Sequence, residues 1–105
     1  MVSTGGGFSL PKGEDFTFGH KQVTTAGTAV QLKTSSTPLR GGVFIRLNNF
    51  DTAGDIVYVG VSDGVSATTG FMVDVYYPCW LEIDDLSDVW IDASHDAVGV
   101  SFMAV

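Results

Sequence analysis

The stretch VYVGVSDGVSATTGFMV (residues 57–73) has the pattern of two β-strands joined by a polar loop. At its start Val57, Val59 and Val61 share one face of an extended chain, while Tyr58 points to the other face. The Ser, Asp, Gly and Thr residues in the middle are typical of turns. The stretch carries no group of residues suited to cutting, transferring or oxidising a substrate. We therefore expect it to build a surface rather than to perform chemistry.

The same strand pattern extends outward along most of the chain. Apolar residues alternate with polar residues in four further segments: GVFIRLNNF (42–50), WLEID (80–84), DVWIDAS (88–94) and VGVSFMAV (98–105). Two earlier segments, KQVTT and TAVQL, flank Ala26-Gly27, and this predicts a hairpin turn at that pair. No long stretch has helical spacing, so helix should make up less than about one-sixth of the chain.

Seven or eight short strands at a spacing of about ten residues predict one all-β domain. We expect an antiparallel β-sandwich or a small barrel, jelly-roll-like in its arrangement. A length of 105 residues suffices for one hydrophobic core. The apolar faces of the strands predict that Val59, Ile83, Ile91 and Val100 lie in that core.

The first 20 residues differ from the rest, with three successive glycines and Pro11 but no sustained alternation. We divide the chain into an extended N-terminal arm (1–20) and a single β-sandwich domain (21–105). The arm either folds back over its own domain or docks on another subunit, and we expect the second. Aromatic side chains would supply buried area there, and cations would meet an acidic rim. The residues expected at this interface are Phe8, Phe16, Phe18, Lys12 and Lys21.

The formal net charge of −7 is unevenly distributed along the chain. Residues 1–50 hold all five cations and two acids, a net charge of +3, whereas residues 51–105 hold ten acids and no cation. Few, scattered cations argue against nucleic-acid binding, which requires clustered Lys and Arg. The acids either solvate the outward faces of the later strands or align neighbouring subunits, since complementary charge guides docking.

Targeting and redox signals are few. No apolar run approaches the roughly 20 residues of a membrane helix, and the N-terminus lacks the order of a signal peptide. We expect no membrane contact. A single cysteine, Cys79, excludes an intrachain disulfide framework and fits folding in a reducing cytoplasm. We expect its thiol to be buried and unreactive, as a lone cysteine commonly is.

Catalytic and metal-binding patterns are weak. Ser94-His95-Asp96 has the letters of a catalytic triad, but consecutive residues point apart, and we interpret them as a polar turn. His20 has no neighbouring nucleophile or metal-spaced partner. Two acidic stretches could offer oxygen ligands to calcium, yet neither has the spacing of a calcium loop. They contain Asn48, Asn49, Asp51 and Asp55, and Asp84, Asp85 and Asp88. We predict no enzyme activity, no metal and no cofactor.

Aromatic residues suggest a different kind of site. Tyr76, Tyr77 and Trp80 lie within five positions, and Trp90 lies on the strand face opposite Ile91. Aromatic rings stack on sugar rings, so these residues could form a carbohydrate site. The alternative is packing, because both faces of a sandwich strand can be covered in an oligomer.

Four segments together resemble a pattern found in small virion proteins of tailed bacteriophages. They are VTTAGTAVQL (23–32), VYVGVSDGVSATTGF (57–71), LEIDDLSDVWIDAS (81–94) and VGVSFMAV (98–105). In that pattern an Ala-Gly-Thr-Ala hairpin precedes a Tyr-Val-Gly-x-Ser strand, and an Asp-Leu-Ser-x-Val/Ile strand leads to the last strand. The resemblance covers residues 23–105 and leaves the arm unmatched. DVYYPCW (74–80) departs from it, since a plainer glycine turn is expected there.

The resemblance implies a non-enzymatic structural protein of the virion, a capsid decoration (cement) protein on the outer surface of a phage head. It implies the major capsid protein or neighbouring virion proteins as partners, and assembly as a homotrimer. The protein would be made in the host cytoplasm and reside on the capsid surface, with the Ser62–Thr69 loop presented to a neighbour. The alternative is a carbohydrate- or receptor-binding module of a phage fibre or tail.

Overall fold

The computed structural model describes residues 16–50, 52 and 54–105, which form eight β-strands and one short helix. The strands are β1 (Thr17–Val23), β2 (Val30–Gln31), β3 (Val43–Asn49), β4 (Val57–Gly60), β5 (Phe71–Val73), β6 (Cys79–Leu81), β7 (Trp90–Ala93) and β8 (Val98–Ala104). The helix, η2 (Leu86–Asp88), is a single 3₁₀ turn. The expected all-β domain with little helix is confirmed.

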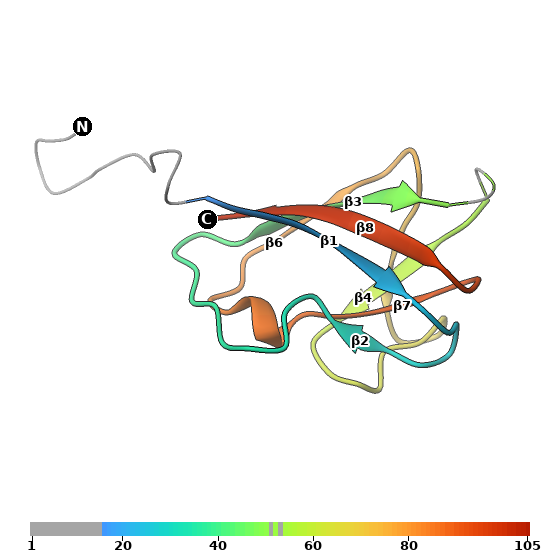
Figure 1. Ribbon diagram of the computed structural model, residues 1–105, viewed down its shortest axis with the longest axis horizontal. Helices are drawn as coiled ribbons and strands as arrows, with labels where there is room; N and C mark the ends of the chain where they lie inside the picture. Colours follow the sequence, from blue (N-terminus) through green and yellow to red (C-terminus); the bar gives the residue numbers. More distant parts are fainter. Residues whose placement is uncertain (1–15, 51, 53) are drawn as a thin grey trace, which may run out of the picture.

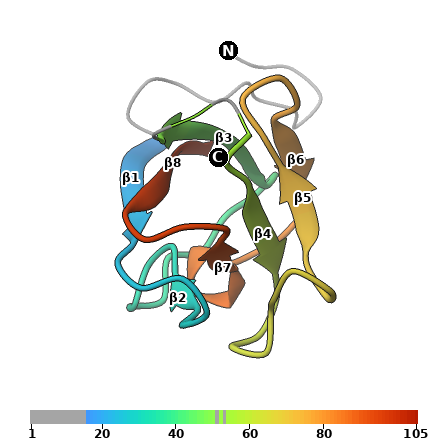
Figure 2. The ribbon, with the colours of Figure 1, turned by 90° about the vertical axis from the view of Figure 1, so that its right-hand side faces the viewer.

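The strands form two four-stranded sheets that pack face to face (Figure 1). The first sheet has the order β1-β8-β3-β6 and the second has the order β2-β7-β4-β5, with antiparallel neighbours throughout. Figure 2 views the sandwich from one end, with β1, β8 and β3 on one side and β2, β7 and β4 on the other. These two strand orders are those of an eight-stranded jelly roll. The expected jelly-roll-like sandwich is therefore confirmed.

The expected hairpin at Ala26-Gly27 is wrong, because the strands on its two sides lie in different sheets. β1 pairs with β8 in the first sheet, whereas β2 pairs with β7 in the second. The turn between them is held by two carboxylates. Asp92 accepts a hydrogen bond from the Gly27 N–H at 2.8 Å, and Asp96 accepts one from the Ala26 N–H at 2.8 Å. Gly27 has a φ of 92°, a conformation that favours glycine.

The core lies between the two sheets and is built from alternate strand residues. The buried strand residues are Val23, Val43, Ile45, Leu47, Val57, Val59, Val73, Cys79, Ile91, Ala93, Val98, Val100, Phe102 and Ala104. Three of the four expected core residues, Val59, Ile91 and Val100, are among them. Ile83 is only partly buried, because it lies beyond the end of β6. Val61 is exposed rather than aligned with Val59, because β4 ends at Gly60.

β1 begins at Thr17, so the last four residues of the expected arm belong to the first sheet. Its side chains alternate between the two faces, with Phe18 and His20 exposed. Gly19 lets the ring of Phe102 lie against the β1 backbone, since a methyl group there would be 2.6 Å from the ring. Residues 1–15 of the expected arm lie outside the described residues.

The loop between β4 and β5 folds back over the outer face of the second sheet. Val65 is buried and covers Gly60, where a methyl group would lie 2.9 Å from Val65 Cβ. Several hydrogen bonds within the loop fix its shape. The Ser66 N–H donates to Thr69 Oγ1 at 2.9 Å, and Thr69 Oγ1 donates to the Gly64 carbonyl at 3.0 Å. This loop therefore closes part of its own sheet.

Candidate binding surfaces

The outer face of the first sheet carries a row of apolar side chains that crosses all four strands. The strand registers place Phe18 of β1 opposite Met103 of β8, and Met103 opposite Phe44 of β3. Phe44 in turn lies opposite Trp80 of β6. Phe18 is 66% exposed and Trp80 is 49% exposed. Cross-strand neighbours lie about 4.5–5.5 Å apart, so these four residues form a continuous apolar strip, which we call the aromatic row.

A row of polar side chains runs beside the aromatic row. His20, Ser101 and Arg46 are register partners across β1, β8 and β3. His20 Nδ1 lies 2.8 Å from Asn48 Nδ2 and 3.1 Å from Ser101 Oγ, and Asn48 also donates to Ser101. Among the described residues, neither His20 Nε2 nor the Arg46 guanidinium has a partner. Both groups are therefore available to a ligand.

Two shallow hollows lie side by side on this face. An apolar hollow of about 260 Å³ is lined by three residues of the aromatic row together with Arg46 and Ser101. A polar hollow of about 420 Å³ is lined by His20, Asn48 and Gly99, among others. At Gly99 the backbones of β8 and β1 lie close together, since a methyl group there would be 2.7 Å from the Lys21 carbonyl oxygen. Members of the polar row line both hollows, so we treat them as one feature, the outer groove.

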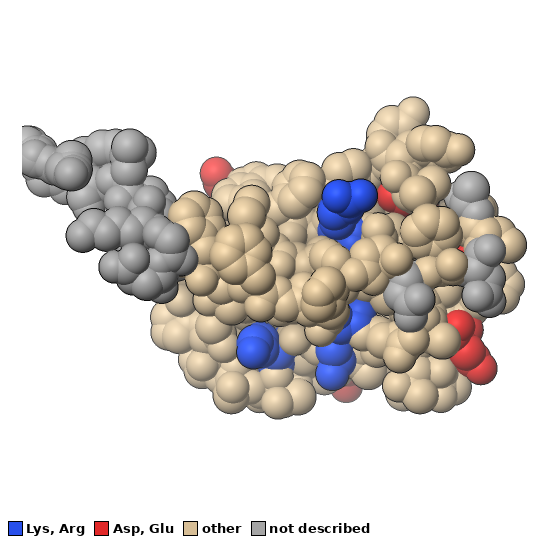
Figure 3. Space-filling model, turned by 45° about the horizontal axis from the view of Figure 1, so that its top comes forward, with Lys and Arg blue, Asp and Glu red and all other residues tan. Residues whose placement is uncertain are grey.

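The outer groove lies on an acid-poor side of the molecule. None of the four strands of the first sheet contains Asp or Glu, and Arg46 of β3 lies on the outer face, whereas Lys21 of β1 lies on the face opposite to Phe18. Figure 3 looks obliquely onto the side formed by β1, β8 and β3, and shows Lys and Arg near the middle of the visible face. Asp and Glu lie mainly toward its margins. Because the chain as a whole is acidic, this face is the one best suited to an anionic ligand.

A second exposed surface lies at β5, an edge strand of the second sheet. Val61, Phe71 and Met72 are each more than half exposed, and we call them the β5 patch. Phe71 and Met72 point to opposite faces of this edge strand, so the patch lies on both sides of the sheet edge. Phe71 is the register partner of the core residue Val59 and is nevertheless exposed at the open edge of the sandwich. The loop that follows β5 also exposes two aromatic residues, Tyr76 and Tyr77. Exposed apolar side chains gathered at a sheet edge make this a candidate interaction site.

The structure separates the residues expected at a partner interface. Phe16 and Phe18 stack at the start of β1, with ring centroids 6.1 Å apart. Lys21 lies on the face of β1 opposite to Phe18, because an odd number of positions separates them along the strand. Phe8 and Lys12 lie outside the described residues. Phe18 was expected in the arm and Trp80 in a cluster with Tyr76 and Tyr77. The structure places both in the aromatic row.

The Ser94-His95-Asp96 stretch forms a turn, and its neighbours differ from those of a triad. His95 Nδ1 lies 2.7 Å from Oδ1 of Asp55, whose side chain is 1% exposed. The carboxylate beside His95 is thus Asp55 rather than Asp96. Ser94 Oγ accepts a hydrogen bond from the Ile56 N–H at 2.9 Å, so the backbone engages this hydroxyl. The His95–Asp55 pair joins the β3–β4 connection to the turn before β8.

The acidic stretch around Asp85 organises a turn. Asp85 is the N-cap of η2 and accepts hydrogen bonds from the Ser87 N–H at 2.9 Å and the Thr37 N–H at 2.7 Å. It also accepts a hydrogen bond from the Ser36 hydroxyl. The bond from Ser36, followed by those from the two backbone groups, holds the pKa of the Asp85 carboxyl well below its ordinary value. The carboxylate therefore joins the chain before β3 to the chain before β7.

Metal and thiol chemistry find no support in the part of the chain that the structure describes. There, no three His, Cys, Asp or Glu side chains gather as metal ligands. Asp51 and the side chain of Asn49, considered above for calcium, lie outside that part. The expected burial of Cys79 is confirmed, and desolvation raises the pKa of its thiol to about 11. The thiol is thus protonated and weakly reactive at neutral pH.

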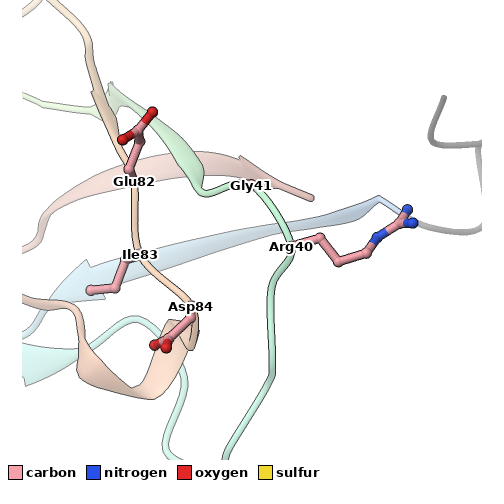
Figure 4. Close-up of a pocket in the computed structure, with 5 residues that line it drawn as sticks. All are labelled: Arg40, Gly41, Glu82, Ile83 and Asp84. Carbon is pink, nitrogen blue, oxygen red and sulfur yellow. The ribbon is translucent and has the colours of Figure 1, made fainter. Parts of the chain in front are cut away.

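A wider hollow of about 660 Å³ lies between Arg40-Gly41 and the segment 82–84. Figure 4 shows that its charged side chains do not converge. Glu82 and Asp84 point in opposite directions from the same extended segment, and Arg40 points away from both. The hollow therefore offers no arrangement of charges around a common point.

Comparisons of the chain with family models, with curated proteins and with solved structures find no match. In the described part of the chain, no helix has the length and apolar character needed to cross a membrane. The outer groove and the β5 patch are the features from which a function can be inferred.

The sequence does not reveal the outer groove as a site. The pattern that could have indicated it is the alternation of Phe18, His20 and Gln22. The expected boundary at residue 20 falls within this alternation and divides it between arm and domain. The rows themselves arise from the register of β1, β8, β3 and β6, and these strands are far apart in the chain. An aromatic strand residue therefore becomes part of a row only once the sheet order is known.

Proposed function

We propose that the protein is a non-enzymatic structural component of a phage virion, a capsid decoration protein on the outer surface of the head. The β5 patch is the observation that carries this proposal. Val61, Phe71 and Met72 are exposed at the edge of a domain whose strand valines and isoleucines are largely buried. Covering such a patch against a neighbouring protein is favourable, because apolar area leaves water.

The fold and the sequence resemblance support the same proposal. Eight-stranded jelly rolls occur in viral capsid proteins and in lectins. A fold does not assign a function by itself. It agrees here with the resemblance of four segments to small virion proteins and with the exposed β5 patch.

In this proposal the domain attaches to the major capsid protein, or to neighbouring virion proteins, through the β5 patch and the N-terminal residues. The Phe16–Phe18 stack lies where residues 1–15 join the first sheet and extends the attachment to that end. Copies of the chain assemble as a homo-oligomer on the capsid surface, and a trimer is the form that the resemblance implies.

Cosedimentation with empty heads tests the proposal. The heads would be assembled from the major capsid protein of the phage that encodes this chain. The intact chain should sediment with them, and the double variant Phe71→Ser/Met72→Ser should bind at least about tenfold more weakly, as loss of central apolar contacts does. Lys33→Gln, an exposed change outside both the β5 patch and the first sheet, should bind like the intact chain. Failure of the intact chain to bind, or equal binding by the double variant, would contradict the proposal.

A further inference from the structure

We propose that the outer groove binds a short acidic oligosaccharide, with sugar rings on the aromatic row and a carboxylate at Arg46. This inference goes beyond capsid attachment. It concerns the first sheet, whereas the β5 patch belongs to the second sheet. The two sites share only Phe18, so variants of Arg46 and of the β5 patch test them separately.

The size of the outer face favours a small ligand over a protein. β1, β3 and β8 have seven residues each and β6 has three. With strands about 4.8 Å apart and about 3.3 Å per residue, the first sheet has a footprint of roughly 380 Å². This is roughly half of the 800 Å² that each partner buries in a standard protein interface. A few sugar residues lying across the strands would cover such a face.

The aromatic row supplies the stacking surface that sugars require. A sugar ring has a face of C–H groups, which packs on the negative face of an aromatic ring, and a rim of hydroxyls. Phe18, Phe44 and Trp80 lie in one row that spans about 14 Å from the first to the last strand of the sheet. The apolar hollow lies within this row, at Phe18, Met103 and Phe44.

The polar row supplies hydrogen-bonding groups for the hydroxyl rim. His20 Nδ1 is engaged by Asn48 and Ser101, which fixes the ring and leaves Nε2 to a ligand. Gln22 donates to the Ala97 carbonyl at 2.8 Å and so is held in place beside the polar hollow. Neutral donors and acceptors beside an apolar strip match the mixed surface of a sugar.

The charge of the face selects an acidic sugar. Arg46 is exposed and has no ion pair among the described residues, and a guanidinium binds a carboxylate through two parallel hydrogen bonds. No acid in the four strands repels an anion. A nucleic acid, with one phosphate per nucleotide, would require more cations than Arg46, the one cation in the first-sheet strands that lies on the outer face.

Isothermal titration calorimetry on the full chain tests the inference with three probes of matched length. They are tetragalacturonate, the neutral sugar maltotetraose and a tetraglutamate peptide. We expect tetragalacturonate to bind at least about tenfold more tightly than the other two, because it alone combines rings with carboxylates. No binding of tetragalacturonate would overturn the inference. Equal binding of maltotetraose would overturn the acidic preference, and equal binding of the peptide would overturn the sugar class.

Two variants at exposed positions locate the ligand. Arg46→Gln should weaken tetragalacturonate binding at least about tenfold and leave maltotetraose binding unchanged. Phe18→Ser should weaken both by about tenfold, because stacking serves either sugar. Lys33→Gln, an exposed cation outside the first sheet, is the control and should change neither. Melting temperatures close to that of the intact chain establish that each variant is folded. Binding unaffected by both Arg46→Gln and Phe18→Ser would overturn the assignment to the outer groove.

Discussion

The outer faces of the two sheets differ in how far loops of the same chain cover them. On the second sheet the 61–70 loop lays Val65 over Gly60, and the 24–29 turn is tied to the buried Asp92. On the first sheet the described residues leave the aromatic and polar rows uncovered. The described residues thus close much of one outer face with their own loops and leave the other available to a ligand.

The residues of the two faces match this difference. On the covered face, Gly60 allows the loop to pack closely on the strand. The buried carboxylate of Asp92 accepts a hydrogen bond from the turn. The open face combines exposed rings with neutral polar groups and contains no acid in its strands, although the chain is strongly acidic. A face that was only solvated would carry charged residues instead of a row of exposed rings. This contrast supports a binding role for the first sheet.

The largest expected effect concerns the core that both sheets share. Ile91→Ala should lower the free energy of unfolding by about 2–5 kcal/mol, because it leaves a cavity between the sheets. Phe18→Ser on the open face should change it by less than about 0.5 kcal/mol. Chemical denaturation measures both. A change below about 0.5 kcal/mol for Ile91→Ala would mean that the register of β7 is wrong.

A smaller loss of stability should show whether the 61–70 loop packs on the second sheet. Gly60→Ala places a methyl group 2.9 Å from Val65 Cβ and should cost about 1–3 kcal/mol through overpacking. Gly64→Ala is the matched control, since its methyl group would meet only Ser62 Oγ at 3.5 Å. Chemical denaturation of the pair tests the covering loop. Equal stability of the two variants would show that Val65 does not rest on Gly60.

The turn on the covered face should depend on its buried carboxylate. Asp92→Ala leaves the Gly27 and Ala93 N–H groups without the acceptor that each has at 2.8 Å, at a cost of about 1–3 kcal/mol. Asp96→Ala removes the exposed bond to Ala26 and should cost less. Thermal melting of both variants measures the difference. A larger loss for Asp96→Ala would contradict the assigned roles.

The smallest expected effect is a pH dependence at Asp85. Its hydrogen bonds lower the pKa in the folded state, so the carboxylate stabilises the fold above the ordinary Asp pKa of about 4. That contribution is lost as the pH falls through the lower folded-state pKa. The difference in melting temperature between the intact chain and Asp85→Asn should therefore shrink as the pH is lowered from 5 toward 2. A difference that grows on acidification would contradict this sign.

Strand positions and buried faces could be predicted from the sequence, whereas strand partners could not. Val43, Ile45 and Leu47 alternate with a period of two, and that local pattern alone identifies a half-buried strand. Partners in a jelly roll are distant, and among the described strands only β4 and β5 are both consecutive and paired. Ala26-Gly27 is a turn, as its residues predict, but it leads to the other sheet.

The candidate site was harder to predict for the same reason. The sequence places Phe44 and Arg46 on the face opposite the core, which the structure confirms. That Phe18 and Trp80 extend the row across the sheet follows only from the order β1-β8-β3-β6. Likewise, the contact between His95 and Asp55 joins two turns that no local pattern relates.

Amide chemical-shift mapping of the full chain with tetragalacturonate tests the contrast between the faces most directly. We predict that the shift changes gather on the outer side of the first sheet, at Phe18, Phe44, Arg46 and Ser101. The amides of the 61–70 loop should not move, because Val65 and its neighbours are already engaged with their own sheet. Shifts concentrated in that loop, or no shifts at saturating sugar, would contradict a binding role for the first sheet.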